Sequence, residues 1–419
     1  MRHLKQLLSV LTGTLFAASL LAVNVEAQTA KVVKIVGNGT ATVTTPGNSP
    51  VALTLGATLT VNTTITTGAG VEVYVEAFDG ATASIKANSV VSVNTLGVHE
   101  AQLELKKGSI VSQLDPDKRA TNKYSVKTPK GVAAARGTAY TISIDFSGGT
   151  NFGTLEGEVI LTPVGGGTPI RMPFGTASIN GAAAQTLAAA IATTPSLKAD
   201  IAAAVTTITQ NVQNGSSGAG SGATTVTVLA AVVSAAAQAL PEQAATFTQQ
   251  AVTAVTSSTS AANSSSGSAA AAAVQAITTA AVMAAPAQAT AIATSATTAA
   301  VQSAVTNSLA ATPGDTTAAA AAGQAASQAV QTAAVAAVTQ AVATGTITAG
   351  AAPSAAQVTA AVQTGGAAGT SQATAGTNTV VAPPVVAPVT STPAPVVTPQ
   401  VVTPTTPIDP GLSVSPSGH

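Results

Sequence analysis

The sequence predicts a multidomain chain of α and β structure: an all-β module first, then Ala-rich α-helical repeats, then a disordered Pro-rich tail. The composition changes sharply near Gly181, because most charged residues and every aromatic residue of the predicted mature chain except Phe247 precede it. Short alternating segments fill the first part, and long Ala, Thr, Gln and Val segments fill the second. These observations place the predicted domains at 28–180, 181–365 and 366–419.

The first part, 28–180, has the period-two pattern of short β-strands. Residues 71–77 and 140–144 alternate with a period of two, and in a strand this alternation directs one set of side chains to a core and the other to water. Turn-forming pairs such as Asp79-Gly80 and Lys107-Gly108 separate such segments. Many short strands joined by regular turns predict an all-β module. The spacing leaves a sandwich, a barrel and a solenoid-like stack open.

Residues 181–365 contain a degenerate repeat marked by proline. Pro195, Pro241 and Pro286 recur at intervals of 46 and 45 residues, and proline suits the first turn of a helix. A large apolar residue follows each proline six positions later: Ile201, Phe247 and Ile292. The pattern predicts two helices per repeat. Because Ala buries little area, these helices must stack on one another, on the β module or on another chain. A loosely helical or disordered low-complexity spacer is the alternative.

From residue 366 the chain is predicted to be a disordered tail rich in Pro, Val and Thr. The motif Val-Val-x-Pro recurs at 385–388, 396–399 and 401–404, and frequent proline excludes helix and central strand. The backbone is therefore expected to be extended and solvated, as a semi-rigid spacer or a docking strip.

Residues 1–27 have the features of a secretory signal peptide. The start is basic at 2–5, residues 7–23 are mostly apolar, and Val25-Glu26-Ala27 resembles a cleavage site. The alternative is an uncleaved anchor helix at the short limit for crossing a bilayer. We therefore expect a periplasmic, cell-surface or secreted protein with no stable membrane span in the mature chain.

The composition excludes several functions. The formal net charge is zero and only 7% of residues are charged, so the clustered Lys and Arg that nucleic-acid binding needs are missing. The chain has no Cys and only three His, which excludes thiolate chemistry and a His-rich metal cage. Glu72 and Glu76 share a strand face that we expect to be solvated. No nucleophile, base and oxyanion site come together, so we predict no enzymatic activity, no cofactor and no metal.

Several segments carry a recognisable pattern in a fixed order. The most specific is 126–140, which contains Val126-Lys127-Thr128-Pro129 and then Arg136-Gly137-Thr138. The other segments are Leu53–Gly56, Ile65–Gly68, Phe78–Gly80, Leu103–Ile110 and Leu155–Val159. Together, over about 31–161, they resemble the FecR-type domain of bacterial envelope proteins. The resemblance implies a periplasmic or cell-surface β module. In the iron-uptake regulators of this family, such a module relays a signal from an outer-membrane transporter to an inner-membrane-bound partner of a sigma factor.

Two functions follow from the resemblance and the predicted signal peptide. A cleavable signal without a recognisable cytoplasmic domain favours a stand-alone exported protein. Its module would contact an unknown envelope protein or a cell-wall glycan, with the helices and tail as scaffold or spacer. The alternative is a periplasmic signalling component of FecR type, coupled to an outer-membrane transporter and to sigma-factor regulation. The Ala-rich helices are a further candidate surface for self-association, and no nucleic-acid partner is expected.

The candidate site residues are Pro129, Arg136, Gly137 and Thr138, in the most specific segment. Arg136 is either a contact to a ligand or partner, or a structural guanidinium that ties carbonyls or a carboxylate across a turn. The resemblance marks these four residues as a fold signature or as possible contacts, and it names no ligand.

Overall fold

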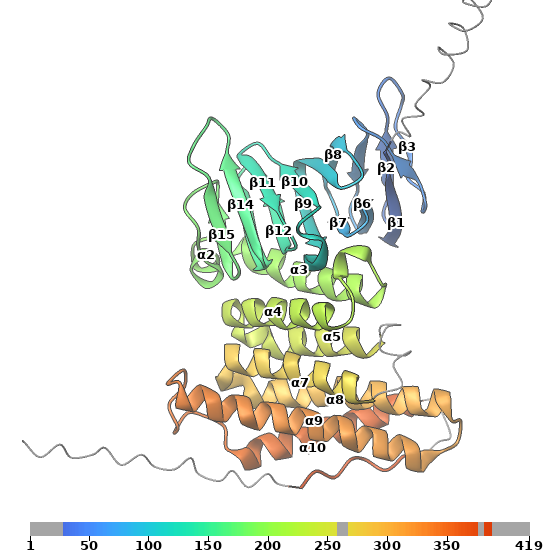
Figure 1. The fold of residues 1–419 in the computed structure, drawn as a ribbon, viewed down its shortest axis with the longest axis vertical. Coiled ribbons are helices and arrows are strands. Elements are labelled where there is room, and N and C mark those ends of the chain that lie inside the picture. Colours follow the sequence, from blue (N-terminus) through green and yellow to red (C-terminus); the bar gives the residue numbers. More distant parts are fainter. Residues whose placement is uncertain (1–27, 258–266, 376–380, 388–419) are drawn as a thin grey trace, which may run out of the picture. The chain divides into compact units, whose positions relative to one another are not determined.

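The computed structural model describes residues 28–257, 267–375 and 381–387. The predicted signal peptide and residues 388–419 of the predicted tail lie outside these ranges. Within them the chain forms seventeen strands followed by eight α-helices (Figure 1). This order confirms the prediction of an all-β module followed by Ala-rich helices.

The β module is built from two sheets that share one long strand, β9 (Glu100–Leu114). The other strands are β1 (Ala30–Gly37), β2 (Ala41–Thr44), β3 (Val51–Ala52), β4 (Thr58–Leu59), β5 (Thr64–Thr67), β6 (Val71–Phe78), β7 (Ala81–Ile85), β8 (Val90–Leu96), β10 (Lys123–Lys127), β11 (Gly131–Ala135), β12 (Ala139–Ile144), β13 (Thr150–Glu156), β14 (Glu158–Pro163), β15 (Ile170–Pro173), β16 (Thr176–Ile179) and β17 (Gln185–Thr186). The first sheet has the order β4-β1-β6-β7-β9-β12-β13-β16-β17. The second has the order β3-β2-β5-β8-β9-β10-β11-β14-β15.

Strand β9 joins the two sheets because each half of it pairs in a different one. Residues 101–107 pair with β8 in the second sheet, and 108–114 pair with β7 and β12 in the first. All pairings are antiparallel except that of β9 with β10. The inward side chains of both sheets form one apolar core, which includes Val73, Leu103 and Phe152. The module is therefore a sandwich, one of the three architectures that the strand spacing left open.

The helices follow in pairs, with a proline between the two helices of each pair. They are α2 (Leu187–Thr193), α3 (Ser196–Gln213), α4 (Ala223–Ala239), α5 (Ala244–Ser257), α7 (Gly267–Ala284), α8 (Ala289–Ala311), α9 (Thr316–Ala343) and α10 (Ala355–Ala373). Pro195 directly precedes α3, and Pro241 and Pro286 each open a 3₁₀ turn that leads into α5 and α8. The helices predicted after these prolines are therefore formed.

Successive pairs stack in two columns, as the layers of helices in Figure 1 show. The first helices of the pairs pack in the order α2, α4, α7 and α9, and the second helices in the order α3, α5, α8 and α10. Ile201, Phe247 and Ile292, the large apolar residues after the prolines, are all buried in one continuous core of the stack. The Ala-rich helices therefore stack on one another, as expected from the small apolar area that each Ala can bury.

Within the described residues, no single helix has both the length and the apolar character of a membrane span. The helices Ser268–Ala284 and Pro286–Ala311 reach these limits only as a pair, with a bend of 118° between them.

The predicted start of the tail at residue 366 falls inside a helix. Helix α10 continues to Ala373, and its start is fixed by a capping box in which Ser354 and Gln357 exchange hydrogen bonds with each other's backbone. Residues 381–387 are extended, as predicted for the Pro-rich sequence, but Val381 and Val386 are buried against the helices. The described part of the predicted tail is therefore packed on the stack.

Candidate functional site

The two sheets of the β module present different outer faces. The first sheet is covered by helices, because α3 contacts β9 and β12, α4 contacts β13, and α2 contacts β16. Val111 and Leu155 of this face belong to the same core as the helical residues Ile201 and Ile208. Gly153 makes room for this contact, since a Cβ at that position would lie 3.1 Å from Ile201 Cδ1. The first sheet is thus an internal interface between the module and the stack.

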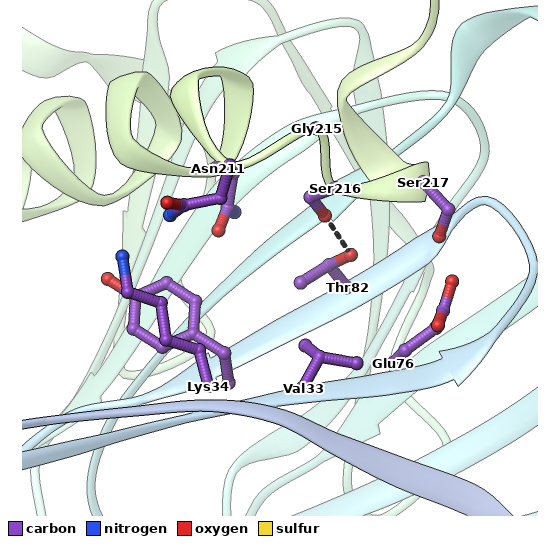
Figure 2. A pocket seen from close by; sticks show the side chains of 10 residues that line it. Val33, Lys34, Glu76, Thr82, Asn211, Gly215, Ser216 and Ser217 are labelled. Atoms are coloured by element: carbon purple, nitrogen blue, oxygen red, sulfur yellow. Dashed lines mark hydrogen bonds between the residues drawn. The ribbon is translucent and has the colours of Figure 1, made fainter. Parts of the chain in front are cut away.

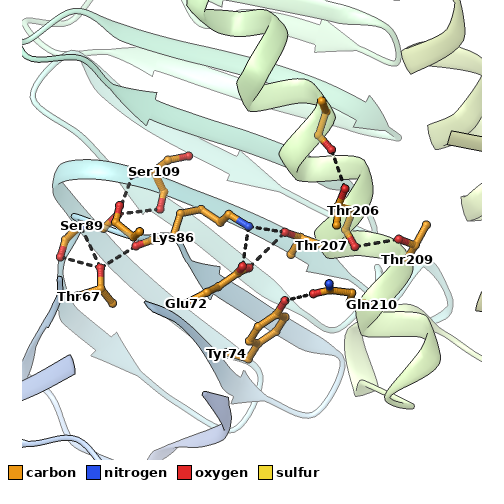
Figure 3. Close-up of polar contacts among 12 residues, drawn as sticks. Thr67, Glu72, Tyr74, Lys86, Ser89, Ser109, Thr206, Thr207, Thr209 and Gln210 are labelled. Carbon is orange, nitrogen blue, oxygen red and sulfur yellow. Dashed lines mark hydrogen bonds and ion pairs between the residues drawn. The ribbon is translucent and has the colours of Figure 1, made fainter. Parts of the chain in front are cut away.

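A polar network crosses this interface (Figure 3). Lys86 Nζ lies 2.7 Å from Glu72 Oε2 and donates to Thr207 Oγ1 at 2.8 Å, while the Thr207 hydroxyl donates to Glu72. The Tyr74 hydroxyl donates to Gln210 Oε1 at 2.6 Å. Burial, aided by the nearby Glu72 carboxylate, raises the pKa of Tyr74 far above its usual value. The expectation of a solvated face is wrong for Glu72, because α3 covers it.

A cavity of about 320 Å³ opens beside this network, between β1, β6, β7 and the C-terminal end of α3 (Figure 2). Lys34 Nζ lies 5.6 Å from the centre of the Tyr74 ring, and the Thr82 and Ser216 hydroxyls are hydrogen-bonded across the cavity. Glu76 lines the other side in Figure 2. Among the described residues, neither Lys34 nor Glu76 forms an ion pair. A polar ligand could therefore meet a cation, a carboxylate and several hydroxyls here.

Among the described residues, no helix packs on the outer face of the second sheet. Its central part, which we call the open face, consists of outward side chains of β9, β10, β11 and β14: Gln102, Glu104, Ser125, Lys127, Val132, Ala134, Ile160 and Thr162. Val132, Ala134 and Ile160 form an apolar centre, and Ile160 is 38% exposed. Lys127 Nζ lies 3.0 Å from Glu104 Oε1 beside it. An apolar centre with a polar border is the arrangement found at protein interfaces.

The four predicted site residues lie around the β10–β11–β12 segment and have different roles in the fold. Pro129 is exposed in the turn between β10 and β11. Arg136 follows β11 and is exposed, and among the described residues its guanidinium has no hydrogen bond or ion pair. The structure therefore gives no support to a guanidinium that ties a turn together, and Arg136 is free to contact a partner.

Gly137 and Thr138 carry the chain from the second sheet to the first. Gly137 has a positive φ of 58°, and a Cβ there would lie 2.7 Å from Pro116 Cα. Both constraints require glycine. Thr138 is fully buried and its carbonyl accepts from the Leu114 amide. These two residues maintain the crossover between the sheets, so the fold alone explains them.

Glu156 is a buried carboxyl near this crossover. It pairs with Ala139 in the first sheet, and among the described residues its Oε2 has no hydrogen-bond partner. Burial raises the pKa of Glu156 to about 7, although Arg119 acts in the opposite direction. Glu156 therefore changes its charge near neutral pH.

The described residues contain no group of three or more His, Asp or Glu side chains that could hold a metal ion. The cavity residues Lys34, Thr82, Asn211 and Ser216 were not predicted as a site. They come from three segments, at 34, 82 and 211–216, that lie far apart in the chain, and no motif connects them. Only the contact of α3 with the first sheet brings them together.

Residues 63–160 match the family described as FecR protein. This match confirms the resemblance to the FecR-type domain seen in the motifs of that segment. No curated protein matches the chain. Two crystal structures of a "putative anti-sigma factor" from Parabacteroides distasonis ATCC 8503, at 2.50 Å and 1.65 Å resolution, are similar to 28% of this chain at 14% identity, with a TM-score of 0.24. The match spans about half, 53%, of the length of those chains.

Proposed function

We propose that this protein is a FecR-type signalling component of the periplasm, in which the β module recognises an outer-membrane transporter. The observation that carries this proposal is the position of the family match. Residues 63–160 include all of β9, β10 and β11 and the start of β14, which form the open face. The matched segment contains strands of both sheets, and β9, β10, β11 and the start of β14 are the part of it whose outer surface no described helix covers.

The chemistry of the open face supports a protein partner. Val132, Ala134 and Ile160 supply an apolar centre that a partner can desolvate, while Lys127 and Glu104 supply a polar border. Arg136 adds an exposed guanidinium close to this surface, with all its donors available. We therefore place Ile160 at the centre of the contact and Arg136 at its edge.

Retention of envelope proteins by the immobilised chain tests this function. The wild-type protein is incubated with solubilised envelope fractions of its own cells, beside the variant Ile160→Asp and the control Phe146→Asp. Phe146 is fully exposed in the loop between β12 and β13, away from the open face. We expect one outer-membrane transporter to bind the wild type and the control and to be lost from Ile160→Asp. Retention of bulk cell-wall material alone, or equal retention by Ile160→Asp, would contradict the proposal.

A second candidate function is recognition of a glycan or another small polar ligand, favoured by the cavity beside α3. Within the described part of the chain neither Lys34 nor Glu76 forms an ion pair, and the remaining lining is rich in hydroxyl and amide groups. Calorimetric titration with soluble cell-wall fragments tests this function. We expect heat of binding that Glu76→Gln reduces. Absence of any heat with the wild-type protein would leave the open face as the sole candidate.

A further inference from the structure

The strip of residues 381–387 occupies a groove between α9 and α10 that α8 completes at the end where Val381 lies. Val381, Pro384 and Val386 are buried, whereas Ala382, Pro383, Val385 and Ala387 are exposed. The strip therefore presents three side chains to the helices at positions one, four and six. We write this pattern as V-x-x-P-x-V.

The groove contacts the strip through its backbone and through its proline. Gln331 Nε2 donates to the Ala387 carbonyl at 2.9 Å, and Gln363 Nε2 donates to the Val386 carbonyl at 3.3 Å. Gly366 lies against the proline, since a Cβ on Gly366 would stand 2.5 Å from Pro384 Cγ.

The two valines fill apolar sites at either end of the groove. Val381 joins a small cluster with Val301, Val305 and Ala319, and Val386 joins the main core of the helical stack. Amide donors for the carbonyls, a flat site for a proline ring and pockets for spaced apolar side chains are the means by which proteins bind extended Pro-rich peptides.

The pattern recurs beyond this strip, and an overlapping copy at Val380, Pro383 and Val385 lies one residue out of register with the buried set. Val396, Pro399 and Val401 repeat the spacing of Val381, Pro384 and Val386, fifteen residues further along the chain. The Val-Val-x-Pro segments at 385–388 and 401–404 lack a valine at the sixth position, where Thr390 and Thr406 stand. Residues 396–401 therefore carry the side chains that the groove selects.

We propose that the groove between α9 and α10 is a binding site for V-x-x-P-x-V sequences, and that residues 396–401 of this chain are its second occupant. The two segments compete for one groove, and both are tethered to it, so both have a high effective concentration. Exchange of the nearer segment for the farther one adds fifteen residues to the loop between α10 and the groove. It removes the same fifteen residues, about 45 Å of extended Pro-rich chain, from the free end beyond the groove. The groove thereby sets the length of the tether between the helices and the C-terminus.

Competition with a labelled peptide tests this proposal in the full-length chain. The probe is a fluorescein-labelled peptide of residues 394–403, measured by fluorescence anisotropy. Three proteins are compared: the wild type, P384A, and P384A/P399A, in which both internal segments are weakened. We expect the affinity for the probe to rise in that order, with the double variant at least about tenfold tighter than the wild type. A probe with Ala in place of Pro399 serves as the control and should bind weakly to all three.

Two further measurements keep the result interpretable. The variant Gly366→Val fills the proline site, and we expect it to abolish probe binding while circular dichroism shows the helices intact. Light scattering distinguishes a tail that binds its own groove from one that binds a neighbour, because only the latter raises the mass with concentration. If P384A and P384A/P399A bind the probe equally, residues 396–401 are not an occupant. If all three proteins fail to bind it, the groove does not recognise the pattern.

Discussion

The β module and the helical stack bury cores of different composition. The module's largest fully buried side chains include Tyr74, Tyr140 and Phe152 beside many Leu and Ile residues. The stack buries mainly Ala and Val, with Phe247 as its one buried aromatic residue in the described part. Small side chains allow the helices to approach closely but bury less apolar area for each residue. Stability in the stack therefore depends more on close backbone packing and on a few large residues.

Most buried threonines of the described helices find a hydrogen-bond partner within their own helix. In the stack, Thr248, Thr256 and Thr297 each donate their hydroxyl to the carbonyl four residues earlier. In the module, the buried hydroxyls of Thr150 and Thr154 have no partner among the described residues, and Thr278 is the corresponding exception in the described stack. A helix places the carbonyl of the preceding turn within reach of the Thr hydroxyl, whereas the extended backbone of a strand places no carbonyl of its own at that position. Thr is therefore compatible with a buried helix although its helix propensity is low.

The largest expected effect comes from removing the aromatic residue of the stack. We expect Phe247→Ala to lower the free energy of unfolding by about 3–5 kcal/mol, because the small neighbours cannot fill the cavity. Chemical denaturation followed by far-UV circular dichroism measures this loss. Phe152→Ala is the matched change in the module, where larger neighbours surround the site. If Phe247 stabilises the stack alone, the helical signal of Phe247→Ala should be lost before the strand signal. Loss of both signals in one transition would contradict this local role.

Because α10 packs closely against α8, we expect a Gly→Ala substitution in α10 to lower the stability of the fold, although this substitution normally stabilises a helix. In an exposed helix, Gly→Ala stabilises by about 1 kcal/mol. A Cβ on Gly369 would lie 2.6 Å from the Thr298 carbonyl oxygen, so we expect Gly369→Ala to cost about 2 kcal/mol instead. The control is Gly323→Ala in α9, whose nearest neighbour, Val305 Cγ2, is a side chain at 3.2 Å. Thermal denaturation compares the two, and equal effects would argue against backbone packing as the cause.

The buried Glu156 makes the stability of the β module depend on pH. Its pKa rises from 4.5 to about 7 on folding, so between these values the folded chain holds more protons than the unfolded chain. Stability therefore falls as pH rises through this window, by up to about 3 kcal/mol. We expect Glu156→Gln to remove most of this fall in urea denaturation at a series of pH values. Burial also raises the pKa of Asp200, so this carboxyl contributes to the fall in the same direction. Glu158→Gln, at the ion pair with Arg171, is the control, and an unchanged slope in Glu156→Gln would refute the assignment.

The sequence predicts the order of the regions and the family, because both depend on local signals. Each of these signals is contained in a short stretch of sequence: the alternation in 71–77, the prolines at the helix starts and the motif in 126–140. The cavity and the covered face of the first sheet could not be predicted, since they arise where α3 packs on strands far away in the chain. The continuation of α10 past residue 365 was missed for a related reason. Its glycines resemble a linker in sequence, but they allow close contact with α8.

The smallest expected effect tests the contrast between the buried threonines directly. Thr→Val keeps the shape of the side chain and removes the hydroxyl. At Thr154 the hydroxyl is buried without a partner among the described residues, so we expect Thr154→Val to stabilise the chain by about 1 kcal/mol. At Thr248 the hydroxyl donates to the Ala244 carbonyl at 2.7 Å, so Thr248→Val should destabilise it by up to about 1 kcal/mol. Urea denaturation at fixed pH measures both. We expect the two changes in the free energy of unfolding to have opposite signs, because the hydroxyl has a partner at Thr248 and none at Thr154. A stabilising Thr248→Val would show that the hydrogen bond of this helical Thr does not stabilise the stack.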